Sequence, residues 1–77
     1  MLYRLCELLV HSLVERPEAL KIDRIETERV DLFFLHVAEA DRGRLLGKGG
    51  RTIDALRTFL EAAAVRVDRD VVVEIIE

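Results

Sequence analysis

The chain carries three glycines in four residues, Gly47-Lys48-Gly49-Gly50, between two stretches that otherwise favour helix. Leu45 and Leu46 lead into the run, and residues 51–66 follow it with the apolar spacing of a helix. Because glycine adopts positive φ and has no Cβ, the run predicts a tight turn whose main chain a ligand can approach closely. A helix that starts after such a turn presents unpaired N–H groups and the positive end of its dipole. The turn is therefore a candidate site for an anionic ligand.

Basic residues gather around this turn. Between positions 42 and 53 the charged side chains before Asp54 are Arg42, Arg44, Lys48 and Arg51, which give this window a charge of +4. The whole chain has a net charge of −3, so the other residues carry −7. Basic residues beside a turn are often only a solvated face, but here they coincide with the glycines. The pattern favours one docking face for a nucleic acid on a body that repels polyanions elsewhere.

Periodicity predicts six elements in the order α-β-β-α-α-β. They are a helix from Leu2 that Pro17 stops, strands at 20–27 and 30–38, a short helix at 41–46, a long helix at 51–66, and a strand at 71–76. We expect Asp41 to cap the short helix and Gly47 to end it in the left-handed conformation. Strand 30–38 is apolar on both faces and is expected at the centre of the sheet. The fold class is therefore α+β, with three helices on one face of a three-stranded sheet.

The length of 77 residues predicts a single domain over residues 1–77, with no room for a catalytic lobe. Cys6 is the only cysteine, so no internal disulfide is expected, and its apolar neighbours predict a buried thiol. His11 and His36 have no further ligand at metal spacing, and residues 43–48 lack the spacing and the hydroxyl of a P-loop. We expect no catalytic residues, no metal and no cofactor.

The order of elements, with the glycine turn between the second and third helices, resembles the type II KH fold. The stretch DRGRLLGKGGRTIDALR from Asp41 to Arg57 resembles the signature of KhpA, a family of small bacterial single-KH proteins, and the closing strand VVVEII is similar to theirs. One departure is that Leu45 and Leu46 stand where the family usually has a Val/Ile–Ile pair. The exchange is apolar for apolar, so it affects the shape of the groove rather than the turn.

This resemblance implies a cytoplasmic, non-enzymatic RNA-binding protein, an RNA chaperone acting in post-transcriptional regulation. It implies single-stranded RNA as a partner, a homodimer, and association with a larger Jag-like KH protein. The loop of a KH domain clamps about four nucleotides. Carried over to this chain, the RNA-binding residues are the clamp and the side chains lining its groove: Gly47, Lys48, Gly49, Gly50, Arg42, Arg44, Leu46, Arg51 and Ile53.

Two other binding classes remain as alternatives. A helix-turn-helix DNA-binding protein also places two helices around a short turn, with base-reading residues such as Arg51 and Thr52 at the start of the second helix. A dimerisation adaptor is the other alternative, because the long helix has a second apolar stripe made of Ala55, Phe59 and Ala62. This stripe is our candidate dimer interface.

Overall fold

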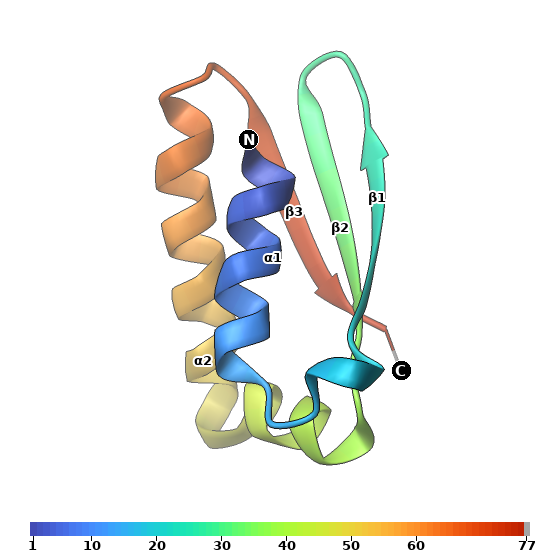
Figure 1. The fold of residues 1–77 in the computed structure, drawn as a ribbon. Helices are drawn as coiled ribbons and strands as arrows, with labels where there is room; N and C mark the ends of the chain where they lie inside the picture. The colour runs from blue at the N-terminus through green and yellow to red at the C-terminus, as the bar shows by residue number, and fades with distance from the viewer. Residues whose placement is uncertain (77) are drawn as a thin grey trace.

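A computed structural model of the protein describes residues 1–76, apart from the side chain of Lys48. Its elements are α1 (Leu2–Leu13), η1 (Pro17–Ala19), β1 (Lys21–Glu26), β2 (Val30–His36), α2 (Glu39–Val65) and β3 (Asp70–Ile75). Figure 1 shows α1 beside the long part of α2, with both helices on the same face of the sheet. The predicted α+β class is confirmed, with two of the expected helices forming the two parts of α2.

The sheet has the order β1-β2-β3 and is mixed. β1 pairs antiparallel with β2, and β2 pairs parallel with β3. In the middle of the sheet Phe33 pairs with Arg24 on one side and Val73 on the other. Asp31, Phe33 and Leu35 are buried while their neighbours along β2 are half-buried. The expected central place of this strand is confirmed.

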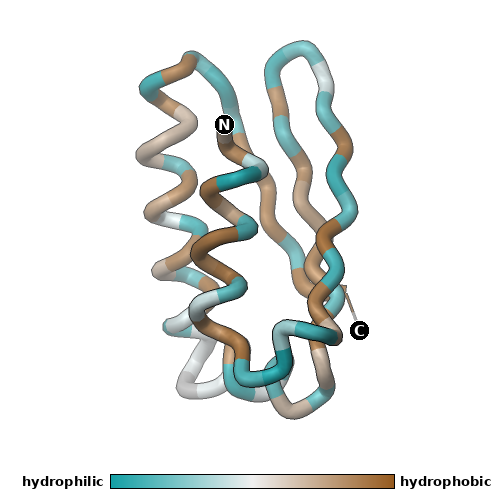
Figure 2. Tube along the Cα trace, viewed as in Figure 1, coloured by the Kyte–Doolittle hydropathy of each residue, from teal (hydrophilic) through white to brown (hydrophobic). Residues whose placement is uncertain are grey.

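The core lies between the sheet and the two helices. Its apolar members come from α1 and the residue that follows it, from β2, from α2 and from β3: Leu2, Cys6, Val10, Val14, Phe33, Leu35, Leu45, Ile53, Leu56, Leu60, Ala64 and Val73. Figure 2 shows hydrophobic and hydrophilic residues recurring along the helices and alternating along the strands, as amphipathic elements require. The thiol of Cys6 is buried as expected, and burial raises its pKa to about 12. Within the described residues neither helix is long and apolar enough to cross a membrane.

The first helix ends earlier than its sequence predicts. α1 stops at Leu13, Val14 is extended, and Pro17 opens the short η1 instead of ending α1. The reason is a competing acceptor, because the N–H groups of Glu15 and Arg16 donate to the carboxylate of Asp41. These groups therefore do not continue the hydrogen bonding of the helix.

Two predictions about the turn are wrong. α2 begins at Glu39 with Ala38 as its N-cap residue, so Asp41 lies inside the helix and does not cap it. Gly47 also lies within α2, and the left-handed residues are Gly49 (φ 72°) and Gly50 (φ 77°). The left-handed backbone therefore begins two residues later than the sequence indicates, and α2 continues through it to Val65.

At the opposite end of the molecule, one arginine ties the loop after α2 to the β1–β2 hairpin. Arg69 donates from Nε to Asp31 Oδ2 (2.9 Å), from Nη1 to the carbonyl of Glu28 (2.9 Å) and from Nη2 to the carbonyl of Thr27 (2.7 Å). Asp31 is one of two buried charged residues of the described chain. The start of β3 is thereby fixed against the hairpin.

Candidate nucleic-acid interface

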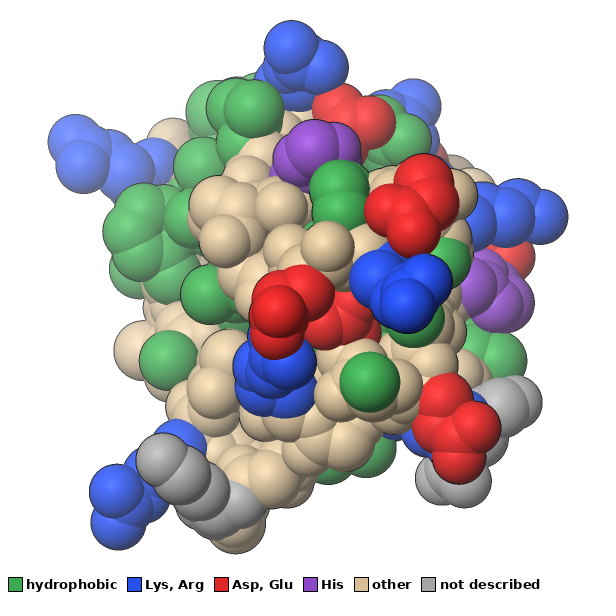
Figure 3. Space-filling model, turned by 60° about the horizontal axis from the view of Figure 1, so that its bottom comes forward, with side chains coloured by type: hydrophobic (Ala, Val, Ile, Leu, Met, Phe, Trp, Pro, Cys, Tyr) green, Lys and Arg blue, Asp and Glu red, His purple; other side chains and the backbone are tan. Residues whose placement is uncertain are grey.

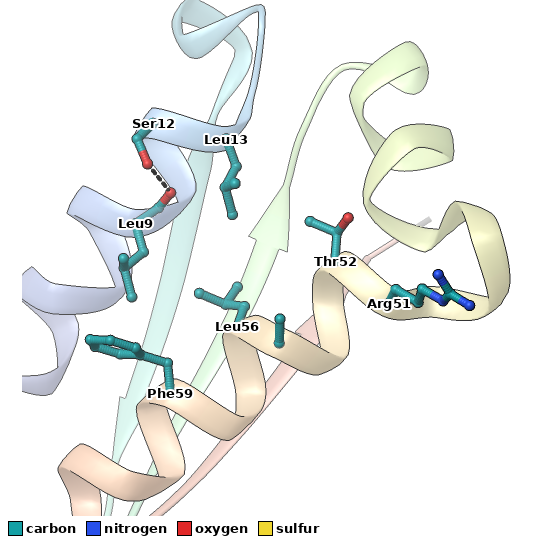
Figure 4. A pocket seen from close by; sticks show the side chains of 8 residues that line it. Leu9, Ser12, Leu13, Arg51, Thr52, Leu56 and Phe59 are labelled. Carbon is teal, nitrogen blue, oxygen red and sulfur yellow. Dashed lines mark hydrogen bonds between the residues drawn. The ribbon is translucent and has the colours of Figure 1, made fainter.

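The direction of α2 changes at the two left-handed glycines. Figures 1 and 4 show a short first part that turns a corner into the long second part, with Arg51 at the corner. A Cβ built on Gly49 would meet no atom within 4 Å, and Gly49 is exposed. The outer side of this turn is therefore open, and an incoming group can reach the backbone directly.

The two left-handed glycines have different surroundings. A Cβ on Gly50 would lie 3.6 Å from Cγ2 of Ile53 and 3.8 Å from Oδ2 of Asp54, both ordinary contacts. The positive φ of each residue strains any side chain there, even where space is available. At Gly47 the backbone is not left-handed, and a Cβ built there would meet no atom within 4 Å, so neither strain nor crowding requires glycine at this position. The turn therefore requires glycine at positions 49 and 50.

Two of the predicted cations are available at this end of the molecule. Arg51 is exposed and Arg42 is half-buried, and no acid among the described side chains pairs with either. The predicted role of Lys48 rests on its side chain, which lies outside the described part. Figure 3 brings this end forward and shows basic side chains projecting at the rim of the surface. These positions suit contacts with phosphate groups from the outside.

Arg44 differs from these two cations because it is already paired. Its Nη2 forms an ion pair with Oε1 of Glu15, and its Nη1 lies 3.6 Å from Oδ1 of Asp41. In the middle of the surface in Figure 3, acidic and basic side chains lie against one another. The window that is acid-free in sequence is therefore not acid-free in space, because Glu15 comes from 29 residues earlier.

Asp41 organises this part of the surface from below. It is 1% exposed, and its two carboxylate oxygens each accept a backbone N–H at 3.0 Å, one from Glu15 and one from Arg16. These hydrogen bonds, the Glu15 one first, and the nearby Arg44 hold the pKa of Asp41 below its usual value, although burial acts in the opposite direction. Asp41 thus fixes the loop after α1 against the first part of α2.

The two apolar residues predicted to contact bases lie in different places. Leu46 is 42% exposed and lies one residue before the glycine run, so it is accessible to a ligand. Ile53 is 2% exposed and belongs to the core, so its predicted place in the groove is wrong. Ile53, Leu56 and Leu60 are spaced along the inward face of α2. Their packing in the core removes Ile53 from the surface.

A groove lies beside the turn, between α1 and the second part of α2. Its volume is about 400 Å³, and its lining is formed by Leu9, Ser12, Leu13, Arg51, Thr52, Ala55, Leu56 and Phe59. Phe59 remains 54% exposed and Leu13 40% exposed. Figure 4 shows both side chains in the space between the helices, where Phe59 lies on the α1 side of α2. Ala55 contributes to this groove, whereas Ala62 is exposed outside its lining.

Comparison with known proteins agrees with this arrangement. The model of the KH domain of KhpA/KhpB matches residues 4–75, which is nearly the whole chain. The chain belongs to this KH-domain family. The type II KH resemblance seen in the sequence is thus confirmed, and the glycine turn occupies the place that the resemblance assigned to it between the two helical parts.

Curated members of the family are similar over almost their full length. The RNA-binding protein KhpA of Clostridium acetobutylicum is 40% identical over 73 residues, which cover 95% of this chain and 97% of that protein. The KhpA of Clostridium perfringens is 39% identical over 72 residues (94% and 96%), and that of Borreliella burgdorferi is 37% identical over 73 residues (95% and 89%). No solved structure matches the chain.

Sequence reasoning missed the residues that approach the turn from α1 and from the loop after it. Glu15 pairs with Arg44, and Leu9 and Leu13 form one wall of the groove beside Phe59. The apolar residues of α1 form one broad face of the helix, and their spacing does not separate the buried side of that face from the half-exposed side. No local signal linked Glu15 with α2.

Proposed function

We propose that this chain binds single-stranded RNA at the turn of α2. The observation that carries the proposal is the pair of left-handed glycines, Gly49 and Gly50, on an open surface at the start of the long helical part. The N–H groups of Gly49, Gly50 and Arg51 donate to phosphate oxygens, and glycine at the first two positions lets the strand approach. Arg51, Arg42 and Lys48 supply the positive charge, and Gly47 completes the clamp without needing a special backbone conformation.

Bases in this proposal turn from the clamp toward the exposed side chain of Leu46. Contact with an apolar side chain tolerates every base, so sequence preference is weak and comes from shape and from hydrogen bonds to base edges. Single strands are favoured over duplexes because their bases can splay away from the stack. The protein acts in this role without catalysis, in the cytoplasm, as part of post-transcriptional control. The relatives named as RNA-binding proteins support the choice of RNA.

Charge reversal in the clamp tests this proposal. The double variant Gly47→Asp/Lys48→Asp places two carboxylates where phosphates are expected, and we expect RNA affinity to fall at least about tenfold. Position 47 is preferable to 49, because a Cβ there meets nothing within 4 Å and the backbone is not left-handed. The matched control is Gly47→Asn/Lys48→Asn, which has the same shape without the added acids. Fluorescence anisotropy with a labelled single-stranded RNA measures affinity, and circular dichroism checks the fold.

The clamp assignment would be lost if the folded double Asp variant bound RNA as tightly as its amide control. The salt dependence separates RNA clamping from duplex DNA reading. Neutralising three phosphates with Lys48, Arg51 and Arg42 predicts a slope of about −2 in log affinity against log salt for a single strand. A slope near zero, or tighter binding to duplex DNA than to single-stranded RNA, supports the alternative classes instead.

We also propose that the protein self-associates through the groove beside Phe59. Phe59 and Leu13 leave apolar surface exposed on both walls, and small Ala55 leaves room for a side chain of a second copy. Ala62 borders this surface from one turn further along α2. Burying the ring contributes roughly 1.5–3 kcal/mol per protomer. A larger KH protein with a similar groove is a second candidate for the same surface.

Phe59→Asp tests this interface when mass is measured by light scattering. A folded monomer supports the interface, an unfolded chain means that Phe59 stabilises the core, and a folded, unchanged dimer means that the interface lies elsewhere. Val65→Asp is the matched control, since Val65 is 76% exposed on the same helix but does not line the groove. We expect this control to leave the mass unchanged.

A further inference from the structure

We propose that Glu15 competes with RNA phosphate for Arg44 and so lowers the affinity of the site. This inference rests on the proposed function, because it concerns a cation next to the proposed clamp. Arg44 lies in the first part of α2, three residues before Gly47, and residues three apart on a helix share a face. Its guanidinium is therefore on the side of α2 that leads into the clamp.

The placement of Glu15 is fixed by its backbone. Its N–H donates to Asp41 Oδ1 at 3.0 Å, and the neighbouring N–H of Arg16 donates to Asp41 Oδ2 at the same distance. Asp41 belongs to α2 and its side chain is buried, so these two hydrogen bonds hold the loop after α1 against the helix. The side chain of Glu15 is thereby presented to Arg44, although 28 residues separate the two in sequence.

The side chain of Glu15 does no comparable structural work. It is 68% exposed and forms an ion pair with Arg44, whose own side chain is 48% exposed. An ion pair this exposed contributes little to stability, because solvent screens it. The side chain can therefore leave Arg44 while the backbone bond to Asp41 stays in place.

The two acids beside Arg44 thus play different parts. Both oxygens of Asp41 are used by backbone N–H groups, and its separation from the guanidinium is 3.6 Å, so its place is determined by the fold. Glu15 occupies Nη2 of Arg44 with a carboxylate that resembles a phosphate oxygen in charge and geometry. An RNA phosphate that reaches Arg44 must displace Glu15, which then rotates into solvent. The energy of that pair is subtracted from the binding energy.

The variant Glu15→Gln removes the competing charge and keeps the backbone N–H that Asp41 binds. We expect it to bind single-stranded RNA about two- to fivefold more tightly than the wild type, the range typical of an exposed ion pair. Glu26→Gln is the matched control. It changes the net charge equally and also removes an exposed acid paired with an arginine, Arg24 at 3.6 Å, but at the hairpin end of the molecule. We expect this control to change RNA affinity by less than about half as much as Glu15→Gln, because Glu26 is far from the site and salt screens its repulsion of the RNA.

Arg44→Gln, alone and combined with Glu15→Gln, identifies the route of the effect. We expect the gain from Glu15→Gln to disappear when Arg44 is absent. An equal gain from Glu15→Gln and Glu26→Gln, or a gain that persists without Arg44, would overturn the proposal and leave RNA binding at the turn intact. Failure of every variant and of the wild type to bind RNA would remove the proposed function, and this inference with it. Circular dichroism confirms that each variant is folded.

Discussion

The two ends of this molecule use arginine in opposite ways. At the hairpin end, Arg69 spends its donors on Asp31 and on two backbone carbonyls, and its side chain is 21% exposed. At the turn of α2, Arg51 is exposed and Arg44 holds only an exposed acid besides the buried Asp41. An arginine whose N–H groups donate within the protein stabilises the fold, whereas an arginine whose N–H groups face solvent can donate hydrogen bonds to a ligand.

The backbones of the two ends differ in the same sense. The loop after α2 contains one left-handed residue, Asp68 (φ 57°), followed by the Arg69 contacts that tie it down. The turn of α2 contains two left-handed glycines with open space outside Gly49. The loop at the hairpin end is thus tied down by its arginine, whereas the turn of α2 keeps open backbone and an exposed arginine above the buried Asp41.

The largest expected effect is on stability at the hairpin end. Arg69→Gln leaves the buried carboxylate of Asp31 without its cation, and we expect the melting temperature to fall by roughly 10 °C or more. RNA affinity measured well below the melting temperature should stay unchanged. Thermal unfolding followed by circular dichroism, with Arg66→Gln as the control on a neighbouring exposed arginine, checks the first point. Loss of RNA binding by a folded Arg69→Gln protein would contradict the division between the two ends.

A smaller loss of stability is expected for Asp41→Asn, which weakens the contact between α2 and the loop after α1. An amide has one acceptor oxygen for two N–H donors, so one hydrogen bond to Glu15 or Arg16 is lost, and the melting temperature should fall by roughly 5–10 °C. The pKa of Asp41 is lowered in the folded chain, so its contribution is present above the unfolded value of about 3.9 and is lost as pH falls through the folded value. The difference between wild type and variant should therefore be largest at pH 5 and above and shrink below about pH 4.

Much of the fold follows from local patterns. The buried residues of α1 and of the stripe Ile53–Leu56–Leu60 recur at helical spacing, and those of β2 alternate, so periodicities of 3.6 and 2 account for their place in the core. The glycine run also marks the place where α2 turns. Which glycines of the run become left-handed could not be predicted in the same way. The left-handed conformation falls on Gly49 and Gly50 rather than on Gly47 because of how the two helical parts pack, which spacing does not encode.

The acidic side of the site could not be predicted. Asp is a residue type that often caps helices, so the sequence predicts that role for Asp41. Only the folded loop after α1 brings the N–H groups of Glu15 and Arg16 to its carboxylate. The pairing of Glu15 with Arg44 is equally a product of tertiary structure. Ile53 was misplaced for a related reason, since an apolar residue near a site can face the core or the ligand, and packing decides between them.

The smallest stability effects come from within the turn, and they should have opposite signs. Gly49→Ala forces a side chain into a left-handed conformation and should destabilise the chain by about 1–2 kcal/mol. Gly47→Ala lies in helix with open space around its Cβ and should stabilise it by up to about 1 kcal/mol. Urea denaturation measures both. Equal effects at the two positions would mean that the turn does not depend on the left-handed glycines.

The most direct test of the account is a titration of isotope-labelled protein with a short single-stranded RNA, followed by amide chemical shifts. We predict the largest changes at the amides of Gly49, Gly50 and Arg51, and changes near zero at Arg69 and along the β1–β2 hairpin. The opposite pattern, with the turn unaffected and the hairpin end shifted by RNA, would contradict the claim that RNA phosphates bind at the turn of α2.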